Sequence, residues 1–229
     1  MRTRILSILT FLTICVGVNA QNVNIPDANF KNYLVNNHTI NTNQDTEIQV
    51  SEATAFTGAI SCSNLSISDL TGIEAFTNVR YLYCSDNSLT SLDLSSLTSL
   101  EDLQCQYNAL TSLDISNNSL YTLYCNNNQI TSLDISTNTA MDEFDCSNNA
   151  LTYLNVANSN NTFSYYFNAV NNPNLTCIQV DDIAWSNANW STAIDATASF
   201  SANCALSTDS FTFKEVSLYP NPTSSILNI

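Results

Sequence analysis

Apolar residues between positions 59 and 180 recur at two nested spacings. The segment 100–119, LEDLQCQYNALTSLDISNNS, returns almost unchanged as 120–139, LYTLYCNNNQITSLDISTNT. Each copy contains two halves whose apolar residues stand at the same offsets. In the first copy these residues are Leu100, Leu103 and Cys105, followed by Leu110, Leu113 and Ile115. A repeat of this length is typical of a solenoid, in which each turn buries its apolar face only against its neighbours.

The two halves of each repeat have the same apolar offsets ten residues apart, and this short spacing indicates which elements form. A turn this short leaves no room for a helix on its second side. The second halves also contain β-branched Thr and Ile, with Asp and Ser at positions that disfavour a helix interior. We therefore expect a mainly β solenoid with a short parallel strand on each side of every turn. Five or six turns spaced about 4.8 Å apart would form a rod roughly 25–30 Å long.

Cysteine and asparagine occupy fixed positions in this repeat. The cysteines are Cys62, Cys84, Cys105, Cys125 and Cys146. One cysteine per turn lacks the clustered spacing of a zinc or iron–sulfur site, so we expect inert core thiols. An asparagine follows the last four of them by three residues, at Asn87, Asn108, Asn128 and Asn149.

In the final turn we expect Asn168 at the cysteine position and Asn171 at the asparagine position. The column of asparagines should point inward, where amides can satisfy backbone groups of the next coil and stack as a hydrogen-bonded ladder.

The pattern L-x-x-L-x-C-x-x-N over 59–180 resembles the leucine-rich repeats of bacterial proteins. It is most similar to a nested subtype, internalin-like in general type, with two L-x-x-L-x-L halves in each repeat. The resemblance implies recognition of a protein or a surface glycan by the face of the strands, without catalysis. It does not name the ligand.

The outward positions differ between the two sides of the predicted turns. The second side repeats Thr, Asp and Ser, which suits a solvated surface, whereas the first side varies and carries aromatic and acidic residues. Such a mixture is typical of recognition surfaces, although Tyr is also simply common in strands. The expected ligand-binding face consists of Tyr81, Tyr83, Asp102, Gln104, Tyr124, Glu143, Asp145, Tyr165 and Phe167.

Residues 21–58 are expected to form an N-terminal cap with a helix over 26–36, which would cover the first exposed turn. The loop that follows has oxygen-bearing residues at the spacing of an EF-hand calcium loop. Its candidate ligands are Asn41, Asn43, Asp45, Glu47 and Glu52. Thr46 replaces the usual turn glycine, so an ordinary polar turn is the alternative.

Residues 181–206 depart from the repeat and are expected to form a C-terminal cap through Trp185, Trp190, Ile194 and Phe200. Cys177 and Cys204 bracket this segment outside the inward cysteine column. In an oxidising export compartment, a disulfide between them would tie the cap to the last repeat.

The two ends of the sequence carry export signals. Residues 1–20 have the charged start, apolar run and small-residue cleavage site of a secretory signal peptide. Segment 207–229 contains a linker and then LYPNPTSSILNI, which resembles the start of the C-terminal sorting domain of type IX secretion in certain Gram-negative bacteria. That resemblance implies passage through the periplasm, with the type IX secretion machinery as a partner, to the outer surface or the medium. Since the sorting domain would continue further, we expect the chain to be a fragment.

The charge and residue content of the chain disfavour several classes of function. The chain has 20 acidic residues against five Lys and Arg, a formal net charge of −15, which disfavours nucleic acid and anionic membranes as partners. We expect no membrane insertion after signal cleavage. With one His and no nucleophile or phosphate-binding motif, the chain lacks a recognisable catalytic constellation. We therefore expect no enzyme and no cofactor beyond the calcium considered above. Alternatives to the recognition module are a surface spacer, with or without stabilisation by calcium, and an accessory protein or divergent enzyme acting on glycans.

Overall fold

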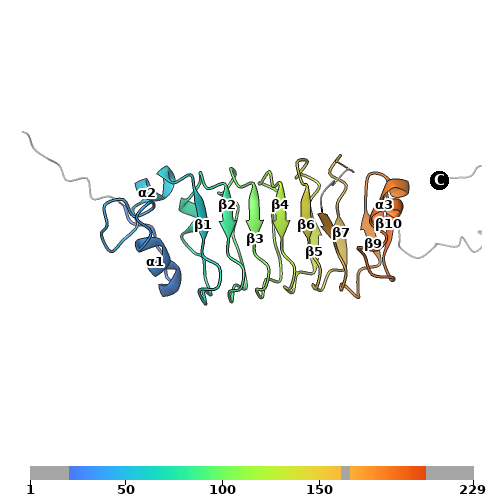
Figure 1. The fold of residues 1–229 in the computed structure, drawn as a ribbon, viewed down its shortest axis with the longest axis horizontal. Helices are drawn as coiled ribbons and strands as arrows, with labels where there is room; N and C mark the ends of the chain where they lie inside the picture. Colours follow the sequence, from blue (N-terminus) through green and yellow to red (C-terminus); the bar gives the residue numbers. More distant parts are fainter. Residues whose placement is uncertain (1–20, 161–165, 205–229) are drawn as a thin grey trace, which may run out of the picture.

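Ten short strands stack along one axis in two parallel sheets, in a computed structural model that describes residues 21–160 and 166–204 (Figure 1). The first sheet has six strands in the order β1-β2-β3-β4-β6-β8. These are β1 (Ala59–Ser61), β2 (Tyr81–Tyr83), β3 (Asp102–Gln104), β4 (Thr122–Tyr124), β6 (Glu143–Asp145) and β8 (Tyr166–Asn168). The result is a solenoid of about seven turns, longer than the five or six expected, because the segment 199–201 beyond the predicted repeats pairs in parallel with residues 177–179 and extends the stack.

The second sheet is shorter than the sequence pattern predicts. It consists of β5 (Ser132–Asp134), β7 (Tyr153–Asn155), β9 (Cys177–Gln179) and β10 (Ser199–Ser201). In the described part of the chain, the second side of the turns before β5 is not assigned as strand, although Leu94, Leu110 and Leu113 are buried there. The side chains on this side can point into the core without regular backbone hydrogen bonds between neighbouring turns.

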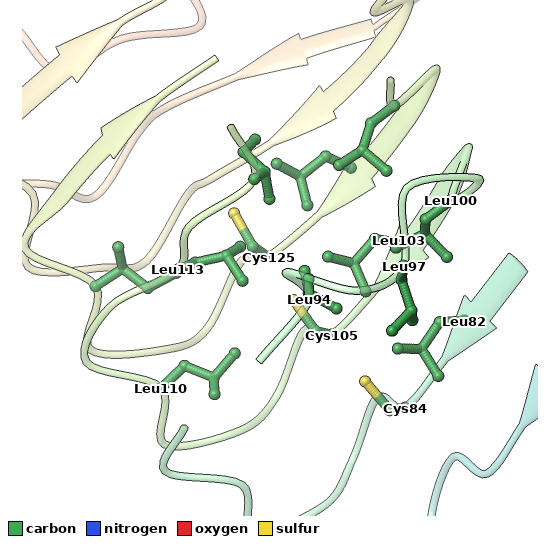
Figure 2. Close-up of a cluster of buried hydrophobic side chains, with 14 of the residues drawn as sticks. Leu82, Cys84, Leu94, Leu97, Leu100, Leu103, Cys105, Leu110, Leu113 and Cys125 are labelled. Carbon is green, nitrogen blue, oxygen red and sulfur yellow. The ribbon is translucent and has the colours of Figure 1, made fainter. Parts of the chain in front are cut away.

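Leucine and cysteine side chains from successive turns fill the space between the two sides (Figure 2). The middle residue of each first-sheet strand points inward, and Leu82, Leu103 and Leu123 are aligned by the parallel register. The cysteine two residues further on lies directly beside the leucine row, and all five repeat cysteines are buried free thiols. The core is therefore a continuous column rather than a central cluster.

A ladder of asparagines closes each turn on the inside. Asn128 shows the pattern: its Nδ2 donates to the carbonyls of Cys105 and Cys125 at 3.1 Å, and its Oδ1 accepts from the Leu110 amide at 2.9 Å. The same contacts recur at Asn87, Asn108, Asn149 and Asn172. The amides bond to backbone groups of two turns rather than to one another, so they serve as substitute backbone partners.

In the last repeat, the residues at the cysteine and asparagine positions differ from those expected from the sequence. Asn172, not Asn171, occupies the ladder position, and the buried Ala169, not Asn168, takes the place of the cysteine. Asn171 instead adopts φ 60° immediately before the ladder residue, as do Asp86, Tyr107, Asn127 and Asn148 in their turns. This left-handed residue turns the chain at each corner, and Asn and Asp adopt the conformation more readily than other non-glycine residues.

A second asparagine ladder lies on the other side of the turns. Asn118 donates to the Leu97 carbonyl at 2.8 Å, Asn138 to the Ile115 carbonyl at 3.3 Å and Asn158 to the Asn138 carbonyl at 2.9 Å. All three side chains are buried. The sequence-based prediction covered only the asparagines three residues after a cysteine, and it therefore missed this ladder.

The N-terminal end of the stack is covered by two helices, α1 (Ala28–Val35) and α2 (Val50–Ala55), with a short 3-10 helix, η1 (Ile73–Ala75), in the first turn (Figure 1). The Asp27 carboxylate caps α1 by accepting from the amides of Asn29 and Phe30 at 2.9 and 3.0 Å. Phe30 and Leu34 are fully buried, which joins the helix to the column of the solenoid.

At the other end, α3 (Ile183–Asn189) and β10 complete the last turn. Trp190 stacks on Phe167 with ring centroids 4.3 Å apart and also contacts Phe200. A disulfide joins Cys177 to Cys204, with a Cα–Cα distance of 5.8 Å, and confirms the pairing expected from the sequence. The signal peptide and sorting segment expected at 1–20 and 207–229 lie outside the described residues.

Candidate functional site

The outer surface of the first sheet carries two adjacent columns of side chains. Each strand has three residues, and the first and third point outward because the middle one faces the core. One column contains Tyr81, Asp102 and Glu143, and the next contains Tyr83, Gln104, Tyr124 and Asp145. The parallel register therefore brings together the residues that sequence analysis assigned to this face over β2, β3, β4 and β6.

The register of the last strand differs from the sequence-based assignment. Phe167 pairs with the inward Phe144 and is only 7% exposed, so it belongs to the core and not to the ligand-binding face. Tyr166 and Asn168 occupy the outward positions instead. Phe167 lies 23 residues after Phe144, a longer interval than the 21 residues in the preceding turn, which explains the misassignment. Tyr165 lies outside the described residues.

Tyrosine hydroxyls on this surface donate to carboxylates of neighbouring turns. Tyr83 donates to Asp102 at 3.0 Å, and Tyr166 donates to Asp145 at 3.3 Å. Tyr124 makes the same contact with Glu143, and its ring lies edge-on to that of Tyr166 with centroids 6.4 Å apart. We call these six residues the tyrosine–carboxylate face. It consists of Tyr83, Asp102, Tyr124, Glu143, Asp145 and Tyr166.

Partial burial changes the acid–base properties of this face. Burial and the hydrogen bond to Asp102 raise the pKa of Tyr83 to about 12, and burial with the Glu143 contact raises the pKa of Tyr124 further. Burial also raises the pKa of Asp102, although the Tyr83 hydrogen bond opposes it. The tyrosines therefore remain neutral hydrogen-bond donors at neutral pH, held in fixed positions by the carboxylates.

One cation lies at the start of an interior strand of the same sheet, next to the tyrosine–carboxylate face. Arg80, which directly precedes β2, forms two hydrogen bonds to the Glu101 carboxylate, the one from Nε being 2.9 Å long. Its guanidinium carbon lies 5.5 Å from the centre of the Tyr81 ring. The sequence pattern did not place Arg80 on this surface, because its partner Glu101 lies on the neighbouring turn, 21 residues later.

The aspartates on the second side have a structural role. Asp93, Asp114 and Asp134 each accept a hydrogen bond from the amide two residues later, at 2.8–2.9 Å. Such bonds shape the corner after each second half. The repetition of Asp in this column therefore follows from turn geometry. On the first side only Asp145 and Asn168, among the outward residues described, accept the corresponding hydrogen bond, and the other positions vary.

The N-terminal loop predicted to bind calcium uses its oxygens as hydrogen-bond acceptors. Glu52 Oε1 accepts from the amides of Thr42 and Asn43 at 2.8 and 3.2 Å, and Asp45 Oδ1 accepts from the Glu47 amide at 2.7 Å. Glu47 pairs with Lys31, and the Nδ2 of Asn41 donates to two backbone carbonyls.

Within residues 21–160 and 166–204, His, Cys, Asp and Glu side chains form no group of three placed to hold a metal. Calcium binding by this loop stays a prediction from spacing. The loop would have to release the donors around Glu52 before that carboxylate could ligate a cation.

The repeat thiols lie in an environment that favours the protonated form. Burial raises the pKa of Cys62 to about 12 and raises those of Cys84, Cys105, Cys125 and Cys146 well above the ordinary value. Since the thiolate is the reactive and metal-binding form, this column is suited to packing rather than chemistry.

Solved structures similar to this one include internalins of Listeria monocytogenes. The functional domain of InlJ, described as including a cysteine ladder, is 28% identical with a TM-score of 0.53, and the match covers 70% of this chain but 39% of that one. Internalin InlF is 17% identical with a TM-score of 0.45, covering 81% of this chain and 74% of that one. Internalin C2 is 18% identical with a TM-score of 0.44, covering 82% and 94%.

The chain thus has an internalin-like leucine-rich-repeat fold. No family model and no curated protein matches it. Among the described residues, no helix is both long enough and apolar enough to span a membrane.

Proposed function

We propose that this chain is a secreted or cell-surface recognition module that binds a protein or a surface glycan through the tyrosine–carboxylate face, without catalysis. The contrast between the two sides of the solenoid carries the proposal. The Asp column of the second side serves the corners of the turns, whereas the aromatic and acidic residues of the first sheet vary from turn to turn. Variation on a regular scaffold is what a specific binding surface requires.

Three further observations support the proposal. Aromatic side chains held by hydrogen bonds lose little conformational entropy on binding, which favours recognition. The Cys177–Cys204 disulfide suits an oxidising environment outside the cytoplasm. The internalin-like fold favours a protein ligand by analogy alone. Export through the signal peptide and the type IX pathway belongs to the proposal and rests on the sequence at the two ends.

Replacement of the three tyrosines tests this function. The variant Tyr83→Ala/Tyr124→Ala/Tyr166→Ala should lose binding to bacterial or host cell surfaces, because it removes the aromatic contacts of the face. A control variant, Thr111→Ala/Thr131→Ala/Tyr153→Ala, alters the second side and should bind as the wild type does. Binding is measured with labelled protein, after circular dichroism has shown that both variants fold.

Equal binding by the wild type and both variants would show that the ligand does not contact this face, and no binding by the wild type would favour a spacer.

A further inference from the structure

We infer that the tyrosine–carboxylate face binds a basic segment of a protein partner, with Arg or Lys side chains seated against its aromatic and carboxylate pairs. This inference deepens the proposed function and rests on it, because it names the chemistry of the ligand at the same surface. Three observations carry it: a cation already bound in this manner, unneutralised carboxylates beside it, and their spacing along the stack.

Arg80 shows how this sheet holds a cation. Its guanidinium makes two hydrogen bonds to Glu101 and lies over the ring of Tyr81. A planar guanidinium matches a carboxylate with two parallel donors, and the face of an aromatic ring attracts the same positive charge. An arginine of the chain itself thus occupies one tyrosine and carboxylate combination on this surface.

The neighbouring combinations contain the same groups without a cation from the described chain. The cationic Lys and Arg side chains in residues 21–160 and 166–204 are Lys31 and Arg80, and they pair with Glu47 and Glu101. The carboxylates of the tyrosine–carboxylate face are therefore stabilised by hydrogen bonds and not by opposite charge. Their positions are those of Asp102, Glu143 and Asp145.

Two of these carboxylates, Asp102 and Glu143, are arranged to gain from a cation. The Oε1 atom of Glu143 accepts no hydrogen bond from the described residues, whereas its Oε2 is held by Tyr124. Asp145 is 8% exposed, and its carboxylate accepts from the Ser147 amide, the Asn168 side chain and the Tyr166 hydroxyl, so hydrogen bonds already stabilise it. Burial raises the pKa of Asp102, and the negative charge of Glu143 adds to the rise. A cation placed between them would relieve both the lost hydration and the repulsion.

The spacing of the carboxylates suggests how a basic segment would lie. Asp102 is on β3 and Glu143 is on β6, with β4 between them, so the two are about 10 Å apart along the stack. A segment in the polyproline II conformation advances about 3.1 Å per residue and turns every third side chain to the same side. Basic residues three positions apart in a segment that follows the solenoid axis would therefore meet both carboxylates.

A labelled peptide with arginine at every third position tests the inference, together with the same peptide carrying glutamine in place of arginine. The wild-type protein should bind the arginine peptide and not the glutamine peptide, measured by fluorescence anisotropy at low ionic strength. The double variant Asp102→Asn/Glu143→Gln should bind about tenfold more weakly, because two partly buried charges are lost while the tyrosine hydrogen bonds can still form. Binding should also weaken as salt is raised.

A matched variant on the second side separates this surface from general attraction by an acidic protein. Asp93→Asn/Asp114→Asn removes the same number of charges and keeps the oxygens that accept from Ser95 and Ser116. It should bind the arginine peptide as the wild type does. Equal weakening by both double variants, or no binding of the arginine peptide by the wild type, would overturn the inference.

The two proposals fail in different ways. If the tyrosine variant loses binding to cell surfaces while Asp102→Asn/Glu143→Gln retains it, the recognition function stands and its cationic ligand does not. If the tyrosine variant keeps that binding, the recognition face itself is wrong.

Discussion

At the scale of single residues, the ladder asparagines replace backbone partners that the corners of the turns lack. Asn128→Ala would leave the buried Leu110 amide without its acceptor and would remove one of the two asparagine donors from the carbonyls of Cys105 and Cys125, which keep those of Asn108 and Asn149. We expect the free energy of unfolding to fall by about 3 kcal/mol, measured by urea denaturation. The control Asn117→Ala changes an exposed side chain and should stay within about 0.5 kcal/mol of wild type. Similar losses in both variants would contradict the role of the ladder.

The second prediction for a single residue concerns Asp102 and the pH dependence of stability. Burial raises its pKa in the folded state above the value in the unfolded chain, so its favourable contribution is present at low pH and is lost as pH rises through the folded-state pKa. At neutral pH the folded protein therefore carries the cost of burying this charge. We expect Asp102→Asn to be more stable relative to wild type at pH 7 than at acidic pH, in denaturant titrations at both.

For Asp114 on the second side, the contribution of the carboxylate to stability should change with pH in the opposite direction. Hydrogen bonds from Ser116 lower the pKa of its carboxyl, so its contribution is present at neutral pH and is lost as pH falls. Asp114→Asn should therefore lose relative stability at pH 7. A shift of the same sign in both variants would show that burial does not set the pKa of Asp102.

At the scale of elements, the N-terminal cap depends on Glu52. This side chain lies in the first turn of α2 and accepts from the amides of Gln49, Thr42 and Asn43. Glu52→Gln should lower the free energy of unfolding by about 1–2 kcal/mol without added calcium, because it weakens hydrogen bonds to a charged acceptor. Glu47→Gln, which removes a partly exposed ion pair with Lys31, should lose no more than about 1 kcal/mol.

Calcium binding by the N-terminal loop is a separate prediction. Calcium should raise the melting temperature of the wild type, by mass action on the folded state, and should have little effect on Glu52→Gln. Isothermal titration of the wild type with calcium measures the binding directly. Neither heat nor a change in melting temperature would remove the calcium site and leave Glu52 as a structural acceptor.

At the scale of the whole molecule, each turn of the solenoid contacts mainly its neighbours, so damage at one end should stay there. Cys177→Ala/Cys204→Ala opens a loop with a sequence separation of 27 residues and should cost about 3 kcal/mol in the chain-entropy description. Hydrogen exchange should accelerate in β9, β10 and α3 and remain unchanged in β2 to β4. Acceleration throughout the stack would instead indicate one cooperative unit.

Features that depend on spacing within a turn could be predicted from the amino-acid sequence. The inward positions of Leu103, Cys105 and Asn128 follow from their offsets, because those residues meet the same environment in every repeat. The pairing of Cys177 with Cys204 followed from their place outside the inward cysteine column, and the structure confirms it. Most of the candidate face was found in the same way, since strand residues alternate between the core and solvent.

Features that depend on contacts between turns could be seen only in the folded chain. The longer last turn places Phe167 against Trp190 and turns Tyr166 outward, a shift that the local pattern does not reveal. The partners of Tyr83, Arg80 and Asn118 lie about one turn away in sequence, so their roles depend on the register between turns. Spacing along the chain determines which way a side chain points, but stacking determines what it meets.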